Sequence, residues 1–179
     1  MLYFIGYLIR GKAGAYHNAL RKEISETFNT YPLHLKIPPH ITFKAPFKTK
    51  TTDEVEKLLE AFAQKQVSST ITLSDFGHFN NKVIYIDVHA SYEAMRTIDC
   101  LNKKLMELKW LNFGRYESNR KLHTTIAVRY IQQNFNYIWN FIKDDKPYFK
   151  NSFDSIALLK HDGKRWNIHC EFNFQSKGF

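Results

Sequence analysis

The spacing of apolar and polar residues predicts a strand followed by a helix at the start of the chain. Residues 2–9 form an aromatic and aliphatic run typical of a buried strand. Tyr16, Leu20, Ile24 and Phe28 then recur at four-residue intervals, which places them on one face of a helix.

The same pattern extends through the middle of the chain. Pro38 and Pro39 favour extended backbone, because proline fixes its own φ and disfavours helical geometry in the preceding residue, so residues 40–44 are predicted to be a strand. Thr51 and Glu54 match a capping box that opens a helix reaching Phe62. Residues 70–76 and 83–88 flank a polar turn and predict a hairpin.

The second half of the chain repeats this order. Ser91 is a candidate N-cap for a helix that buries Ile98, Leu101, Leu105 and Leu108. Residues 121–130 predict a strand, residues 135–142 a helix, and residues 155–161 and 164–174 a hairpin around Asp162-Gly163.

The repeated order predicts an α+β fold in which two sheet-based lobes face each other. Alternating strands and helices by themselves favour a parallel sheet, but the two hairpins argue for antiparallel pairing. No Gly/Ser-rich linker separates the halves, so we expect residues 1–179 to form a single domain of two interlocked lobes.

Composition narrows the classes of function. Twenty-six basic and 17 acidic residues give a net charge of +9, which favours anionic partners such as RNA or nucleotides. Two cysteines are too few for a secreted disulfide framework or a cysteine-based zinc site, which is consistent with a cytoplasmic protein. No stretch is apolar and long enough to span a membrane, and nothing indicates an obligate protein partner.

One chemical pattern occurs in both predicted motif strands. His40-Ile41-Thr42-Phe43 and His123-Thr124-Thr125-Ile126 each place a His and a Thr on one face of an extended strand. Two imidazoles can supply an acid and a base, and two hydroxyls can donate hydrogen bonds to an oxyanion. The pair therefore predicts a phosphoester-cleaving enzyme.

The chain resembles the 2H phosphoesterase superfamily, whose signature is two His-x-Thr/Ser strands. This superfamily includes the bacterial 2'-5' RNA ligase-like (LigT-like) proteins and RNA 2',3'-cyclic phosphodiesterases. The resemblance extends from the opening strand to the closing hairpin with Trp166-Asn167-Ile168. It implies a bilobal, pseudo-symmetric fold in which two antiparallel sheets face a central, metal-free site.

The resemblance also assigns roles to the matching residues. It implies that His40 and His123 are the acid-base pair and that Thr42 and Thr125 bind phosphate oxygens. For a 2',3'-cyclic phosphate on RNA or a nucleotide, a neutral His would activate water while an imidazolium protonates the departing ribose oxygen. The same reaction with a ribose hydroxyl in place of water would be 2'-5' ligation, and neither reaction requires ATP, a metal or another cofactor.

Strand periodicity adds weaker candidates for substrate binding. Lys44 and Arg129 follow the two histidines at even spacing, so we expect them on the same nominal faces, where they could contact phosphate or simply be solvated. Phe47 and Tyr130 could stack on a base, although ordinary core packing is the more common role of such aromatic residues.

Several alternatives stay open at this point. The chain could be a noncatalytic RNA- or nucleotide-binding module, or the two histidines could be core residues of unrelated strands. The remaining histidines lack the spacing of a metal site. Thr124 occupies a usually apolar position of the motif, so its hydroxyl needs a buried partner. The sequence does not distinguish acid from base, or a 2' from a 3' leaving oxygen.

Overall fold

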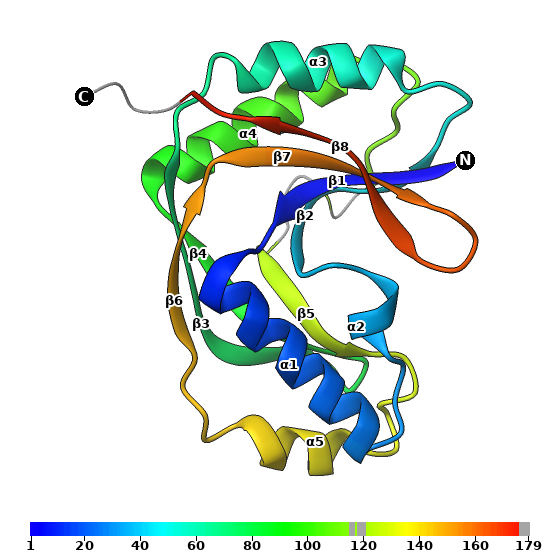
Figure 1. Ribbon diagram of the computed structural model, residues 1–179, viewed down its shortest axis with the longest axis vertical. Coiled ribbons are helices and arrows are strands. Elements are labelled where there is room, and N and C mark those ends of the chain that lie inside the picture. The colour runs from blue at the N-terminus through cyan, green and yellow to red at the C-terminus, as the bar shows by residue number, and fades with distance from the viewer. Residues whose placement is uncertain (115–116, 118–120, 176–179) are drawn as a thin grey trace.

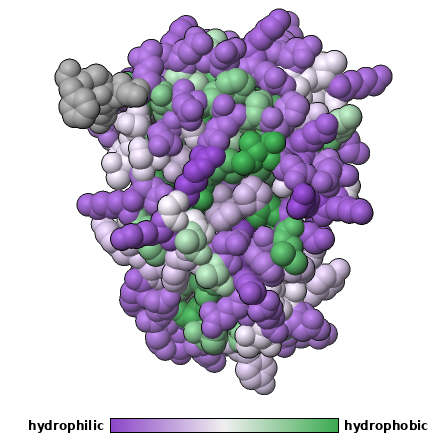
Figure 2. Space-filling model, viewed as in Figure 1, coloured by the Kyte–Doolittle hydropathy of each residue, from purple (hydrophilic) through white to green (hydrophobic). Residues whose placement is uncertain are grey.

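A computed structural model describes residues 1–114, 117 and 121–175. These residues form two four-stranded antiparallel sheets with five helices around them (Figure 1). The predicted α+β class is therefore confirmed. Hydrophilic side chains cover most of the face shown, and hydrophobic surface gathers near its centre (Figure 2). Among the described residues, no helix combines the length and the apolar character that a membrane crossing needs.

The first sheet joins the two ends of the chain and contains β1 (Leu2–Leu8), β2 (His40–Lys48), β7 (Ser155–His161) and β8 (Trp166–Asn173). Its strand order is β2-β1-β7-β8, and every pairing is antiparallel. All residues of β1 after Leu2 are buried, because this inner strand is covered on both faces.

The second sheet comes from the middle of the chain and contains β3 (Ser69–Phe79), β4 (Val83–Ala90), β5 (His123–Val128) and β6 (Tyr148–Phe153). Its order is β5-β4-β3-β6, again with antiparallel pairings. Each sheet therefore has one His-x-Thr strand, β2 or β5, at its edge. The predicted hairpins are exchanged between the halves, because β3–β4 pairs with β5 and β7–β8 pairs with β1.

The helices are α1 (Gly11–Thr27), α2 (Leu33–Lys36), α3 (Asp53–Ala63), α4 (Tyr92–Met106) and α5 (Phe135–Ile142). Although α1 follows a strand of the first sheet, it packs against β5 and β6 of the second. Conversely, α4 follows a strand of the second sheet and also contacts β2. These crossed contacts hold the two sheets together.

Most buried apolar side chains form one core shared by the two sheets, and a smaller cluster lies on the opposite face of the first sheet. Alternation along β1 explains the division, since Tyr3 and Ile5 face the main core while Phe4 and Leu8 belong to the smaller cluster. Leu8 pairs directly with His40, so the face that carries the smaller cluster also carries the first motif.

Two elements were absent from the sequence prediction. α2 has only four residues, too few for a recognisable periodicity. In β6 only Phe153 is fully buried, so the strand lacks the alternating apolar residues that would reveal it. All other predicted strands and helices are present, with boundaries shifted by a few residues.

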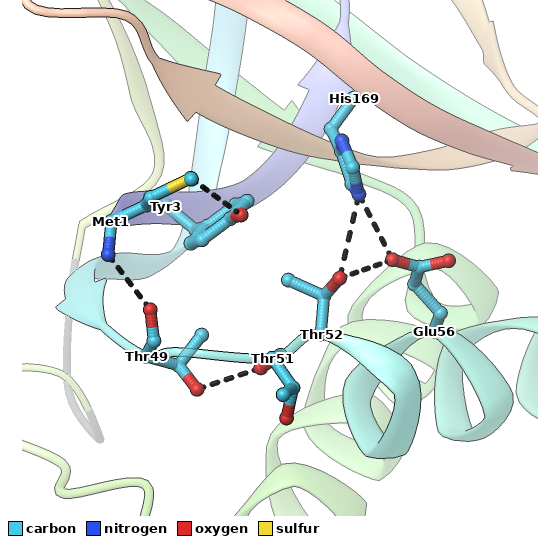
Figure 3. Close-up of polar contacts among 7 residues, drawn as sticks. All are labelled: Met1, Tyr3, Thr49, Thr51, Thr52, Glu56 and His169. Carbon is cyan, nitrogen blue, oxygen red and sulfur yellow. Dashed lines mark hydrogen bonds and ion pairs between the residues drawn. The ribbon is translucent and has the colours of Figure 1, made fainter.

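The start of α3 differs from the predicted capping box. Thr52, not Thr51, is the N-cap residue, and its hydroxyl donates to the Glu56 carboxylate instead of accepting from a backbone N–H. Glu56 also lies 2.9 Å from His169 Nε2 (Figure 3). Because His169 is on β8, these contacts attach α3 to the edge of the first sheet. Ser91, in contrast, caps α4 as predicted, accepting from the Ala94 N–H at 3.2 Å.

Candidate active site

The two motif strands are edge strands of different sheets, and β2 and β5 contact each other. His40 and Thr42 on β2, and His123 and Thr125 on β5, all keep partial contact with solvent. The intervening residues of both motifs are buried, which is the alternation predicted for two half-buried strands. The fold thus brings together two motifs that are far apart in the sequence.

Both motif histidines are held by the same backbone interaction. The Nδ1 atom of His40 lies 2.9 Å from the Pro38 carbonyl oxygen, and Nδ1 of His123 lies 2.9 Å from the Lys121 carbonyl oxygen. Since a carbonyl can only accept, Nδ1 carries a proton in each ring. In the neutral ring the lone pair is then on Nε2, which fixes the nitrogen that exchanges protons with a substrate.

A β-bulge follows each motif at the equivalent position. In each strand, the threonine two residues after the motif histidine, Thr42 or Thr125, and the residue two places after that threonine pair with consecutive residues of the neighbouring strand. The extra residues are Phe43 in β2 and Ile126 in β5, and each is followed by another buried residue, Lys44 or Ala127. The bulges end the simple alternation immediately after the His-x-Thr segments.

The electrostatic environment favours a neutral His40. Burial lowers the pKa of His40 to about 4, and the positive charges of Arg21 and His123 act in the same direction, while the hydrogen bond to the Pro38 carbonyl opposes them. The influence of His123 means that the two imidazoles interact across the junction of β2 and β5. Near neutral pH, His40 therefore presents a lone pair rather than a proton.

Thr124 finds its buried partner in His17 on α1. The Thr124 Oγ1 atom lies 2.8 Å from His17 Nε2, and each residue is only 1% exposed. Burial lowers the pKa of His17 well below its usual value, and the charges of Arg21 and His40 add to the effect, so this ring is neutral. The sequence analysis did not connect these residues, although His17 is on the helix face that also carries Leu20.

Aromatic rings lie beside both motif histidines. The ring centroid of Phe4 lies 4.9 Å from that of His40, while Phe79 and Tyr85 lie 5.0 and 5.1 Å from His123. A Cβ added at Gly77 would approach the Tyr85 ring to 2.5 Å, so the absence of a side chain there lets Tyr85 pack beside His123. Sequence reasoning did not single out these rings, because they are distant in sequence from the motifs.

Two predicted substrate-binding residues are located elsewhere. The bulge at Phe43 turns Lys44 away from the motif face, so the strand-phase argument for Lys44 was wrong. Lys44 is 2% exposed and donates to both Glu117 carboxylate oxygens, at 3.0 and 3.1 Å. Phe47 is also buried, with its ring centroid 6.2 Å from that of Tyr3. Phe47 therefore packs in the core, which was the alternative to stacking on a base.

Arg129 and Tyr130 follow the end of β5 and are both exposed. Both have positive φ angles, 58° and 59°, which are uncommon for residues with a side chain, and residues in such strained backbone conformations cluster at functional sites. The Arg129 guanidinium lies 4.8 Å from the centroid of the Tyr31 ring, in the segment between α1 and α2. These two residues thus remain accessible near the end of the second motif strand.

Comparison with known proteins agrees with this arrangement. Residues 12–165 match the model of the 2'-5' RNA ligase superfamily. The chain belongs to this superfamily. It is also 27% identical to a Bacillus cytotoxicus protein named "Putative phosphoesterase", over 95% of this chain and 92% of the relative. A Bacillus pumilus protein of the same name is 24% identical, over 88% and 94% of the two chains.

Solved structures confirm the LigT-like fold. TT0787 of Thermus thermophilus has a TM-score of 0.71 at 15% identity, over 99% of this chain and 100% of that one. LigT of E. coli, in a structure with 3'-AMP, has a TM-score of 0.60 at 14% identity, over 97% of each chain. LigT has also been solved with ATP, with a TM-score of 0.57 at 15% identity, over 97% and 98%. The match to the 2'-5' RNA ligase superfamily confirms the 2H phosphoesterase superfamily that the two motifs predicted.

Proposed function

We propose that the protein is a metal-independent phosphodiesterase that opens 2',3'-cyclic phosphates on RNA ends or nucleotides. The observation that carries the proposal is the matched geometry of the two motifs. Each histidine is held through Nδ1 by the carbonyl two residues before it, and each is followed by a partly exposed threonine and a bulge. Two histidines held in equivalent positions suit a reaction in which one group accepts a proton and another group donates one.

In the proposed reaction, a water molecule loses a proton to the neutral imidazole and its oxygen attacks phosphorus. The bond from phosphorus to one ribose oxygen breaks, and that oxygen receives a proton from the charged imidazole. The hydroxyls of Thr42 and Thr125 donate hydrogen bonds to the non-bridging phosphate oxygens, where negative charge develops in the transition state. The same sequence of steps, with a ribose hydroxyl in place of water as the nucleophile, would give 2'-5' ligation.

Arg129 and Tyr130 extend the proposed site toward a neighbouring nucleotide. An exposed guanidinium suits a second phosphate, and an exposed phenol ring suits stacking on a base. LigT has been solved with ATP and with 3'-AMP, which supports a nucleotide-containing substrate. We do not include Lys44 or Phe47 among the substrate-binding residues, because both are buried. A reducing, cytoplasmic setting fits this class of substrate.

The test is hydrolysis of 2',3'-cyclic nucleotides and of cyclic-phosphate-ended RNA in the presence of a chelator. We expect His40→Ala and His123→Ala each to lower turnover by about a hundredfold or more. His89→Ala, which alters an exposed histidine of β4, serves as the matched control and should retain activity. Near-normal activity of either motif variant would refute the proposal, whereas tight binding without any product would favour a nucleotide-binding module.

A further inference from the structure

α1 presents a buried polar stripe to the motif strands. His17, Arg21 and Ser25 are spaced four residues apart and are all buried, so they lie on one helix face. His17 contacts Thr124 on β5, Arg21 donates from Nη2 to the Ile37 carbonyl oxygen at 3.0 Å, and the Ser25 hydroxyl lies 3.3 Å from His34 Nδ1. The helix thereby contacts both the β5 strand and the segment that leads into β2.

Arg21 is the unusual member of this stripe. It is 2% exposed, and its hydrogen bonds within the described residues go to the Asn18 side-chain oxygen and the Ile37 carbonyl, both neutral groups. Its Nε atom has no hydrogen-bond partner in the same part of the chain. Burial lowers the pKa of Arg21 to about 10, so the guanidinium still carries its charge at neutral pH. A buried cation without a carboxylate partner is costly, which indicates that the charge has a use.

The hydrogen bond to Ile37 connects Arg21 to His40. Ile37 is followed by Pro38, whose carbonyl accepts from His40 Nδ1, and by Pro39, whose carbonyl accepts from the Ile9 N–H at 3.0 Å. Because Arg21 holds the first peptide of this short segment, it restrains the carbonyl that orients the His40 ring.

The groups around His40 also make Arg21 electrostatically important. Facing His40 are Arg21 and His17 from α1, His123 from β5, and the uncharged ring of Phe4 from β1. Within the part of the chain that the structure describes, no carboxylate is among the groups that influence the His40 pKa. Burial is the largest cause of the low pKa of His40, and the permanent charge of Arg21 adds to it.

We propose that Arg21 is a positioning residue that orients the His40 imidazole and keeps it neutral, so that His40 takes up the proton and His123 delivers one. The proposal rests on the phosphodiesterase function proposed above. Before reaction, the Arg21 cation disfavours a second positive charge on His40. During reaction, His40 Nε2 accepts the proton of the attacking water, while His123 gives a proton to the departing ribose oxygen. Exchange of one proton with solvent at each ring restores the starting states.

The experiment uses Arg21→Gln, which removes the charge but keeps an amide that can reach the Ile37 carbonyl, and Arg21→Lys, which keeps the charge. The titration of His40 is followed by NMR in the free protein, and the dependence of kcat/KM on pH is measured in parallel. We expect Arg21→Gln to move the His40 titration and the acid limb of kcat/KM to higher pH by about half a unit or more. Arg21→Lys should stay close to wild type.

Lys22→Gln is the matched control, because Lys22 is the adjacent cation of α1 but is 60% exposed. It should change neither quantity. An unchanged His40 titration in folded Arg21→Gln protein would overturn the proposal, as would equal losses of stability and kcat in both Arg21 variants with the wild-type pH profile.

The wild-type protein provides a second test that does not depend on the folding of a variant. A His40 titration midpoint at or above about 6.5, the ordinary value for histidine, would overturn the proposal. The NMR measurement needs no substrate, so it can fail or succeed independently of the proposed phosphodiesterase activity. If the protein cleaved no cyclic phosphate but the His40 titration midpoint were low and rose in Arg21→Gln, the proposed function would be contradicted. The effect of Arg21 on His40 would still hold.

Discussion

Thr124 and His17 form a buried hydrogen bond, 2.8 Å long, between β5 and α1. Thr124 lies between His123 and Thr125 but faces the opposite side of the strand, so the bond fixes the back of the second motif. A hydroxyl in a buried motif position would be costly without such a partner. The pair therefore has a structural task that differs from the task of its two neighbours in the strand.

Thr124→Val should destabilise the fold, because it removes the partner of His17 Nε2 in a buried ring whose Nδ1 already has no partner among the described residues. We expect the free energy of unfolding to fall by about 1–3 kcal/mol, measured by urea denaturation. Thr125→Val is the matched control in the same strand and should lower kcat/KM with little change in stability. If Thr124→Val were as stable as the wild type, the hydrogen bond would have no net value.

The stability of the protein should fall as the pH is lowered from about 6.5 toward 5. Burial lowers the pKa of both His17 and His40 in the folded state, so the unfolded chain binds more protons in this range. The contribution of the two neutral rings to the free energy of unfolding is complete above the pKa of histidine in the unfolded chain. It is lost as the pH falls below that pKa, by up to about 1.4 kcal/mol per pH unit for each ring. Urea denaturation at several pH values measures the slope.

His17→Gln provides the control for this pH dependence, since an amide can still contact Thr124 but does not titrate. The slope between pH 6.5 and 5 should become shallower in this variant. His89→Gln, which alters an exposed residue, should leave the slope unchanged. Identical slopes in wild type and His17→Gln would mean that His17 is not the buried neutral ring described here.

Lys44 should contribute to stability and not to substrate binding. Lys44→Met removes the buried cation that donates to both Glu117 carboxylate oxygens, and losing a buried hydrogen bond to a charged group typically costs about 1–3 kcal/mol. KM for a cyclic phosphate should be unchanged. Lys48→Met, at an exposed position of the same strand, should affect neither quantity. A rise in KM for Lys44→Met without a loss of stability would restore the substrate-binding role that strand periodicity predicted.

The Glu117 carboxylate should make the stability of the protein depend on pH in the acid range. Burial by itself raises the pKa of Glu117, but hydrogen bonds from the Gly114 N–H, Lys44 and the Ala45 N–H outweigh it and lower the pKa overall. The resulting stabilisation is present above the pKa of glutamate in the unfolded chain, about 4.3. It is lost as the pH falls through the lower pKa of Glu117 in the folded protein. Glu117→Gln should therefore reduce the stability difference between pH 5 and pH 3.

The contrast between Lys44 and the motif residues shows what the sequence can predict. Alternation within His-x-Thr is a local property of a strand, so the placement of His40 and Thr42 on one face followed directly from their spacing. A bulge depends on how a strand pairs with its neighbour, and the residue type of Phe43 gives no sign of it. Every face prediction beyond the bulge, including that for Lys44, was therefore unreliable.

Contacts between distant elements were also beyond the sequence. The motif indicated that Thr124 needs a partner, but the choice of His17 depends on α1 crossing from the first sheet to the second. The exchange of hairpins between the two halves has the same origin, because pairing partners are set by the packing of the whole chain. What could be predicted was the two motifs and every element except α2 and β6, and what could not be predicted was which distant elements meet.

Gly6 tests whether the position of β2 controls the chemistry. Gly6 pairs with Thr42, and a Cβ added there would lie 2.4 Å from the Ile41 carbonyl oxygen. Gly6→Ala must therefore push β2 away from β1, which displaces Thr42 and lowers kcat/KM by about tenfold or more together with stability. Gly11→Ala is the comparison, because its methyl group meets no atom within 4 Å and its cost is backbone strain at φ +62°. It should lose stability but keep kcat, and equal activity of the two variants would show that the site tolerates movement of β2.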